Sequence, residues 1–170
     1  MSQLNLFGGT KMSIDKARAH LEKYSLADRI IEFDVSSATV SLAALALGTE
    51  EARIAKSLSF LTGDGPILVI TAGDAKINNR KYKDTFGVKA KMIAFELVEE
   101  LIGHGVGGVC PFGINDGVRV YLDESLRRFD IVYPAAGTAQ SAVRLTIPEL
   151  ELASEPESWV DVTATPSDND

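Results

Sequence analysis

Apolar residues recur in short blocks along the chain, some at the spacing of a helix and others in runs typical of strands. Ile14, Ala17 and Leu21 fall on one face of a helix, and we predict a first helix from Ser13 to about Tyr24. The same periodicity, or a capping residue, predicts further helices over residues 40–47, from Glu50, from Asn78 or Asn79 to Gly87, over 95–102, near Asp123 and over 147–152.

Short apolar runs predict the strands. These runs cover residues 29–33, 58–61, 67–71, 89–93, 118–122, 130–133, 141–145 and 159–162, the last as an edge strand. A loop of turn-forming residues, Thr62 to Pro66, joins the second and third runs into a hairpin. Because short helices and strands alternate irregularly, with hairpins as well as crossovers, the pattern predicts an α+β fold with a mixed sheet rather than a regular βαβ series.

Capping residues predict where two of the helices begin and end. Ser36 and Ser37 offer caps for a helix that Gly48 stops. Thr146 and Glu149 have the spacing of a capping box, with Thr at the cap and Glu three residues later.

Composition favours one soluble domain. The chain has 170 residues, of which 45% are hydrophobic and 24% are charged. We predict a single domain over residues 1–164 and a disordered acidic tail over 165–170. Residues 1–10 lack a secretory signal, no apolar run approaches the roughly 20 residues of a membrane span, and the single cysteine excludes an intramolecular disulfide. We therefore expect a cytoplasmic protein without a membrane partner, and leave the oligomeric state open.

Charge is divided unevenly along a chain whose formal net charge is −7. Residues 53–91 hold eight basic and three acidic residues, whereas residues 149–170 hold seven acidic residues and no basic one. Phosphate binding depends on Lys and Arg, so the basic part is the candidate for contact with nucleic acid. The alternative is a solvated helix face followed by an acidic tail.

The segment from Gly103 to Gly113 holds five glycines and Pro111 within eleven residues. Such density is typical of unusual backbone dihedrals, or of a ligand brought close to the main chain, where consecutive amides can bind an oxyanion or orient water. The segment matches neither a P-loop nor the dinucleotide fingerprint. The alternative is a tight structural connection between a helix and a strand.

The side chains of the usual nucleophile and metal mechanisms lack partners in this sequence. His104 is a candidate general base, but no acidic residue stands next to it; His20 is expected at the surface and Cys110 as a buried structural thiol. Lys56, where a helix gives way to a strand, can present a point charge to a phosphate or carboxylate, or simply be solvated. We predict no metal, no cofactor and no covalent nucleophile.

Three motifs in sequence order resemble one known family. They are Arg53-Ile54-Ala55-Lys56-Ser57-Leu58 before an apolar hairpin, Gly107-Gly108-Val109-Cys110-Pro111-Phe112-Gly113, and Tyr133-Pro134-Ala135-Ala136-Gly137. Their order and spacing over residues 13–153 resemble the YbaK/prolyl-tRNA synthetase editing-domain family. The resemblance implies an α+β fold with a mixed, curved β-sheet flanked by helices, and hydrolysis of mischarged aminoacyl-tRNA, typically on tRNA-Pro.

The resemblance also implies site residues. Lys56 is the functional lysine, and Gly107, Gly108 and Pro111 belong to a loop that positions substrate or water. The further expected substrate-binding residues are Gly113, Gly137, Thr138 and His104, and the expected tRNA contacts are Arg80, Lys81 and Lys83. Some relatives carry a histidine after the second glycine loop, which this chain lacks at residues 138–141, so the amino acid specificity is not carried over.

An aminoacyl ester is already activated, so its hydrolysis needs only a placed water, a proton acceptor and stabilisation of the oxyanion. In the family, the terminal ribose hydroxyl is thought to assist. We expect a trans-editing deacylase that removes a small amino acid such as Ala or Cys from tRNA-Pro, with prolyl-tRNA synthetase as a possible partner. The alternatives are a non-catalytic tRNA- or nucleotide-binding relative, and an interaction module that binds a synthetase through its acidic end.

Overall fold

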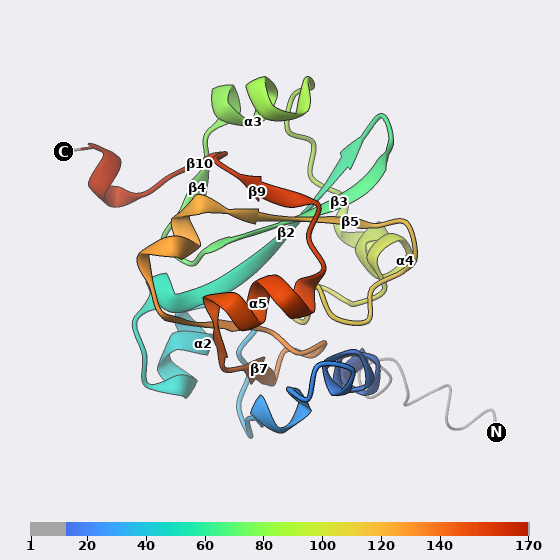
Figure 1. Ribbon diagram of the computed structural model, residues 1–170, viewed down its shortest axis with the longest axis vertical. Helices are drawn as coiled ribbons and strands as arrows, with labels where there is room; N and C mark the ends of the chain where they lie inside the picture. The colour runs from blue at the N-terminus through green and yellow to red at the C-terminus, as the bar shows by residue number, and fades with distance from the viewer. Residues whose placement is uncertain (1–12, 170) are drawn as a thin grey trace.

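A six-stranded sheet forms the centre of the computed structural model, which describes residues 13–169 (Figure 1). Its strand order is β8 (Leu145–Thr146), β6 (Ile131–Pro134), β2 (Ile54–Thr62), β3 (Gly65–Ala72), β5 (Arg119–Asp123) and β9 (Ser158–Val160). The pairs β2–β3 and β6–β8 are antiparallel, whereas β2–β6, β3–β5 and β5–β9 are parallel. The predicted α+β class with a mixed, curved sheet is confirmed, and β9 is the predicted edge strand.

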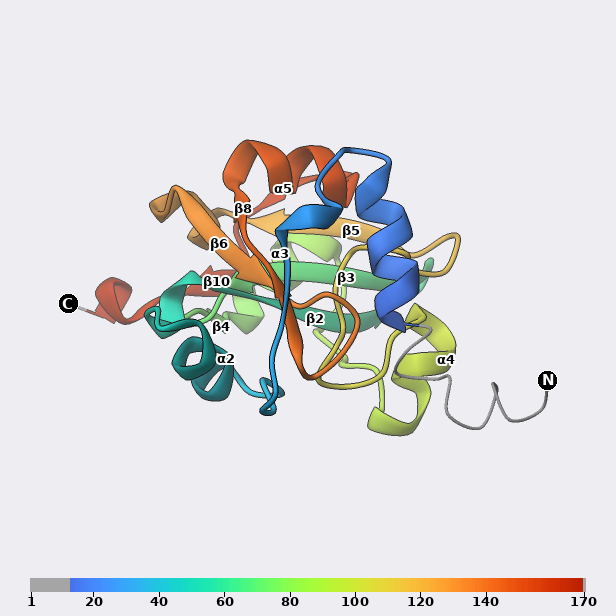
Figure 2. The same ribbon diagram turned by 90° about the horizontal axis from the view of Figure 1, so that it is seen from below.

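Helices cover both faces of this sheet (Figures 1 and 2). On one face lies α3 (Asn79–Phe86), and on the other lie the N-terminal helix, described over residues 13–22, α4 (Val98–Ile102) and α5 (Ile147–Ser154). The short helix α2 (Val40–Leu47) packs at the start of β2, against Ile54 and Tyr133.

Short elements connect these layers. The 3-10 turns are η1 (Ala27–Arg29), η2 (Glu51–Arg53), η3 (Phe95–Leu97), η4 (Glu124–Arg128) and η5 (Pro166–Asn169). Two small antiparallel pairs are formed by β1 (Ile30–Glu32) with β7 (Ser141–Val143), and by β4 (Lys76–Ile77) with β10 (Thr163–Ala164). In the described part of the chain, no helix is long and apolar enough to span a membrane.

The core lies on both sides of β3. Leu68 and Ile70 belong to the larger core cluster, which includes residues of the N-terminal helix, α4 and α5, while Ile67 and Val69 pack with Tyr82 of α3. All four strand residues are fully buried. Burial on both faces explains why this strand appears in the sequence as an unbroken apolar run instead of an alternating one.

Local signals predicted several element ends correctly. Gly48 and Gly87 end α2 and α3 in the left-handed conformation, with φ of 67° and 77°. The capping box at α5 is also confirmed, since the side chains of Thr146 and Glu149 each accept a hydrogen bond from the other residue's backbone amide. The cap of α2 was predicted wrongly: Thr39, next to the helix, accepts the amide of Leu42.

Other differences arise from pairing that only the folded chain shows. The ladder between β2 and β3 continues to Thr62 and Gly65, so the predicted five-residue loop is reduced to a two-residue turn. The predicted strand over 89–93 is a single bridge between Met92 and Phe60. In place of the predicted disorder after residue 164, Pro166–Asn169 forms η5, where the side chain of Asp168 accepts the amide of Thr165 at 2.7 Å. Residues 1–10, predicted to lack a signal, lie outside the described residues.

Candidate functional site

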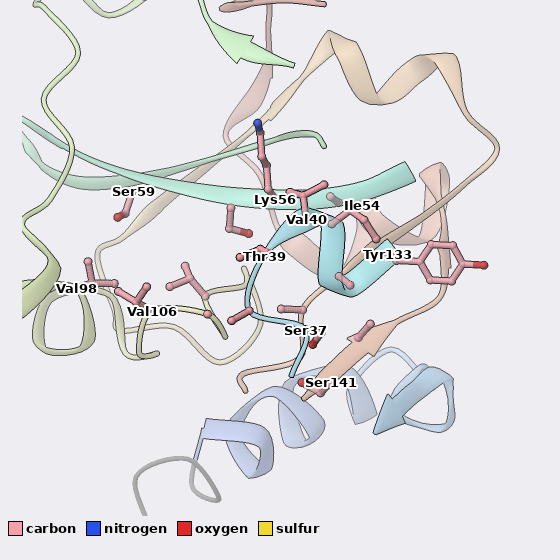
Figure 3. A pocket seen from close by; sticks show the side chains of 18 of the residues that line it. Ser37, Thr39, Val40, Ile54, Lys56, Ser59, Val98, Val106, Tyr133 and Ser141 are labelled. Carbon is pink, nitrogen blue, oxygen red and sulfur yellow. The ribbon is translucent and has the colours of Figure 1, made fainter. Parts of the chain in front are cut away.

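A cleft of about 350 Å³ opens beside β2 (Figure 3). Its lining comes from five segments that are far apart in sequence: residues 37–43, 54–59, 92–98, 106–109 and 133–142. The lining is mostly apolar, with small side chains and hydroxyl groups. None of the residues found to line it is an Asp, Glu, His or Cys, so no side chain of the described lining is an ordinary general base.

Two serines of β2 lie on the floor of the cleft. Ser57 and Ser59 are two residues apart in a strand and therefore share one face, and both line the cleft. The hydroxyl oxygen of Ser57 is buried and has no hydrogen-bond partner within residues 13–169. Because an unpaired buried polar atom is costly, this hydroxyl is available to a ligand or a water molecule. The alternation of Ser57 and Ser59 with Lys56 and Leu58 is visible in the sequence, but it does not by itself mark either serine as a site residue.

Hydroxyl groups also line the opposite wall. Figure 3 shows Ser37 and Thr39 from the segment before α2, and Ser141 from the start of β7. The Ser37 hydroxyl donates to the carbonyl of Ala139 at 2.9 Å and thereby ties the two segments together. Thr39 is held in place as the cap of α2. The sequence placed Ser37 only as a helix cap, because the pairing of its segment with residue 139 is a tertiary contact.

The two glycine motifs meet at the cleft. Gly107 lines it with φ of 95°, a conformation that favours glycine. Gly108 packs directly on the second motif: a Cβ added to it would lie 2.5 Å from backbone atoms of Gly137 and Thr138. The contact is therefore main chain against main chain. The structure brings together Gly107, Gly108 and Gly137, as a common site requires.

Lys56 stands at the edge of the cleft but its ammonium group lies elsewhere. Figure 3 shows the side chain leaving β2 on the side opposite to Ser37, Ser59 and Ser141. The ammonium donates to the carbonyl of Ala75 at 2.5 Å. Burial lowers the pKa of this ammonium, Asp74 partly offsets that effect, and Lys76 adds to it. In this structure the ammonium of Lys56, the lysine that the family resemblance singles out, therefore does not face the glycine loop.

Comparisons with known proteins place this geometry in a family. A model of the aminoacyl-tRNA editing domain matches residues 35–152, which include the floor, the hydroxyl wall and both glycine motifs. The chain belongs to the aminoacyl-tRNA editing domain family. This confirms the resemblance that the three sequence motifs indicated.

Individual relatives agree with this assignment. The editing domain is 48% identical over 152 residues to the uncharacterized protein YwhH of Bacillus subtilis (strain 168), covering 89% of this chain and 97% of that protein. It is 26% identical to the proline–tRNA ligase of Streptococcus sanguinis (strain SK36), over 64% of this chain but 17% of the ligase. A crystal structure reported as a candidate trans-editing enzyme for prolyl-tRNA synthetase has a TM-score of 0.81 and 30% identity, over 89% of this chain and 97% of that one.

Other expected site residues of the editing domain lie away from the cleft lining. A Cβ on Gly113 would lie 2.6 Å from the carbonyl oxygen of Lys16 in the N-terminal helix. Pro111 lines a second hollow of about 320 Å³. Thr138 is buried and donates from its hydroxyl to that of Ser141 at 3.0 Å, so it supports a residue of the cleft wall. The catalytic role of Pro111 and the substrate-binding roles of Gly113 and Thr138 stay predictions.

His104 is fully buried behind the glycine-rich segment and does not line the cleft. Its Nε2–H donates to the carbonyl of Phe112 at 2.6 Å, which leaves Nδ1 unprotonated, buried and without a partner among the described residues. Burial lowers the pKa of the imidazole, the bond to Phe112 acts against this, and the nearby Lys16 and His20 add to the lowering. The neutral ring holds the loop, which is a structural contact.

A pH dependence of stability follows from His104. The unfolded chain takes up this proton near the ordinary pKa of about 6.5, whereas the folded chain does so only at lower pH. The free energy of unfolding is therefore expected to fall as pH drops below about 6.5. His104→Gln should show a shallower fall between pH 7 and pH 5 in urea titrations. Equal slopes for the two proteins would contradict this assignment.

The remaining histidine and the cysteine are structural. Cys110 is buried as predicted, and burial raises the pKa of its thiol to about 12, so it is not a thiolate nucleophile. His20 was expected at the surface, but its side chain is 13% exposed and its Nε2 lies 2.7 Å from the carbonyl of Ala153. That expectation was wrong because α5 packs beside the N-terminal helix. Within residues 13–169, no group of His, Cys, Asp and Glu side chains could hold a metal ion.

The predicted tRNA contacts lie on α3, across the sheet from the floor of the cleft. Arg80 and Lys83 are exposed. Lys81 is paired with Asp161 at 3.1 Å and donates to the carbonyl of Thr163 at 2.9 Å, so it holds α3 to the C-terminal strands. The structure thus separates the three basic residues into two exposed cations and one that is engaged within the protein.

Proposed function

We propose that this editing domain acts in trans as an aminoacyl-tRNA deacylase that removes a small amino acid, such as alanine or cysteine, from tRNA-Pro. The observation that carries the proposal is the cleft itself, which has hydroxyl groups and glycine main chain but no acidic or imidazole side chain in its described lining. The names of the proline–tRNA ligase and of the solved relative support tRNA-Pro as the acceptor.

An aminoacyl ester suits such a cleft because it needs little chemical activation. The ester bond is cleaved by water, whose oxygen joins the carbonyl carbon while the ribose oxygen leaves and takes up a proton, giving free amino acid and tRNA. The vicinal ribose hydroxyl of the substrate can accept a proton from the attacking water while it passes its own proton to the leaving ribose oxygen, so the cleft itself needs no base. We assign the Ser57 hydroxyl and the main chain at Gly107 to orienting the ester or the water.

Size exclusion follows from the lining. Ala135, Ala142 and Val109 lie on the walls, and a larger amino acid side chain would clash with them. Apolar contact discriminates by only about 1–3 kcal/mol per methylene, so rejection by clash contributes more than attraction. A panel of tRNAs, each charged with one amino acid, tests the proposal by the release of free amino acid. Release from none of them, with tRNA still bound, would identify a non-catalytic relative.

The role of Lys56 is tested by Lys56→Met, which keeps the apolar stem and removes the charge. The role that the family resemblance implies for Lys56 requires its ammonium to leave the carbonyl of Ala75 and reach the substrate. If it does so, kcat/KM for alanyl-tRNA-Pro should fall about tenfold or more in this variant. The melting temperature should change little. Lys76→Met, which removes an exposed neighbouring cation, is the control. Full turnover by Lys56→Met would remove this ammonium from the mechanism.

Contact of α3 with tRNA is tested by the double substitution of Arg80 and Lys83 with glutamine. If both cations neutralise phosphates, tRNA affinity should fall and the slope of log K against log salt should decrease by about two. Lys81→Gln is the matched control, because this lysine is engaged with Asp161. An unchanged slope in the double variant would exclude α3 from the tRNA interface.

A further inference from the structure

Three apolar side chains stand exposed on one side of the cleft mouth. Met92, Phe95 and Val106 are 58%, 72% and 52% exposed, and all three line the cleft. Within residues 13–169, Phe95 is the only aromatic residue among the exposed large hydrophobic ones. An exposed apolar group at the rim of a site is typical of a surface that a ligand covers.

Main-chain hydrogen bonds fix the segment that carries Met92 and Phe95. The amide of Leu61 donates to the carbonyl of Lys91 at 2.9 Å, and the amide of Ile93 donates to the carbonyl of Ser59 at 3.1 Å. Met92 is therefore fixed between two bonds to β2, the same strand that forms the cleft floor. Phe95 then begins η3, just before Val98, which is buried and lines the cleft. The ring is presented by a segment anchored at both ends.

We propose that Phe95, flanked by Met92 and Val106, stacks against the terminal base of the acceptor strand. The inference rests on the proposed function: once the ester lies in the cleft, the base is joined to it through a single ribose. The flat face of a base suits an exposed aromatic ring, and stacking of this kind accepts any base. Three side chains are too few for a stable protein partner, whose interface needs about 800 Å² on each side.

The proposal is tested with a substrate analogue that cannot be hydrolysed, alanine joined by an amide to the 3′ position of adenosine. A matched analogue carries the same amide on a ribose without a base. Phe95→Ala should weaken binding of the adenosine analogue about tenfold and leave binding of the baseless one unchanged. Phe95→Tyr should restore the affinity because the ring is kept. Leu97→Ala is the control, since Leu97 is 41% exposed in the same turn but does not line the cleft.

With charged tRNA, Phe95→Ala should raise KM about tenfold and leave kcat nearly unchanged, because the ring touches the base and not the ester. Equal affinity of wild type and Phe95→Ala for the adenosine analogue overturns the stacking proposal. If wild-type protein still releases amino acid in that case, the proposed function stands without it. If wild type neither binds the analogue nor releases amino acid, both proposals fall.

Discussion

Gly108→Ala is expected to lower the free energy of unfolding by about 3 kcal/mol and to abolish deacylation. The added methyl carbon would lie 2.5 Å from the carbonyl carbon and oxygen of Gly137 and from the amide nitrogen of Thr138. These are backbone atoms, so no side chain can rotate away and the two loops have to separate. The measurement is urea unfolding, together with release of amino acid from charged tRNA.

The matched control substitution is Gly105→Ala, three residues earlier in the same glycine-rich segment. Its added carbon would meet only the flexible carboxylate of Glu99, at 3.7 Å. We expect a change in unfolding free energy within about 0.5 kcal/mol, as for surface substitutions that disturb no special feature. Similar losses at Gly105 and Gly108 would show that the close contact between the loops is not what constrains this segment.

Ala135→Leu is expected to lower kcat/KM about 100-fold or more while the protein stays folded. Ala135 lines the cleft and is only partly buried, so the larger side chain extends into the space that the proposed aminoacyl group occupies. A steric block of this kind costs more than the loss of an apolar contact. The measurement is the rate of amino acid release from alanyl-tRNA-Pro, with the melting temperature recorded in parallel.

Ala46→Leu supplies the control for added volume. Ala46 lies in α2 and does not line the cleft, and the change adds the same number of carbon atoms. Its turnover should match that of the wild type. Undiminished release by Ala135→Leu, with Ala46→Leu also active, would mean that the substrate is bound somewhere other than this cleft.

Local sequence signals determined most of the elements and their ends. Gly48 and Gly87 end their helices because glycine alone enters the left-handed region without strain, and the capping box at Thr146 needs only residues three apart. Both depend on neighbours in sequence, so no tertiary information was required. The three motifs, taken in order, also identified the family before any geometry was known.

The hydroxyl groups of the cleft depended on which strand face meets which loop. Ser57 and Ser59 share a face by alternation, but only the packing of residues 37–43 and 106–109 beside β2 makes that face a cleft. The hydrogen-bond partner of Lys56 was equally beyond local reasoning. The alternation of β2 places Lys56 on the other side from Ser57, and the carbonyl that accepts its ammonium, that of Ala75, is contributed by the turn after β3.

The sequence by itself therefore determined the mixed α+β architecture, the helix ends and the membership in the editing-domain family, because these follow from periodicity, backbone conformation and motif order. Only the tertiary structure decided which of those motif residues face a common space. Gly107 lines the cleft, Gly108 joins the two loops, and His104 is enclosed behind them. The physical reason is that a cleft is made by contacts between segments distant in the chain, which no local pattern specifies.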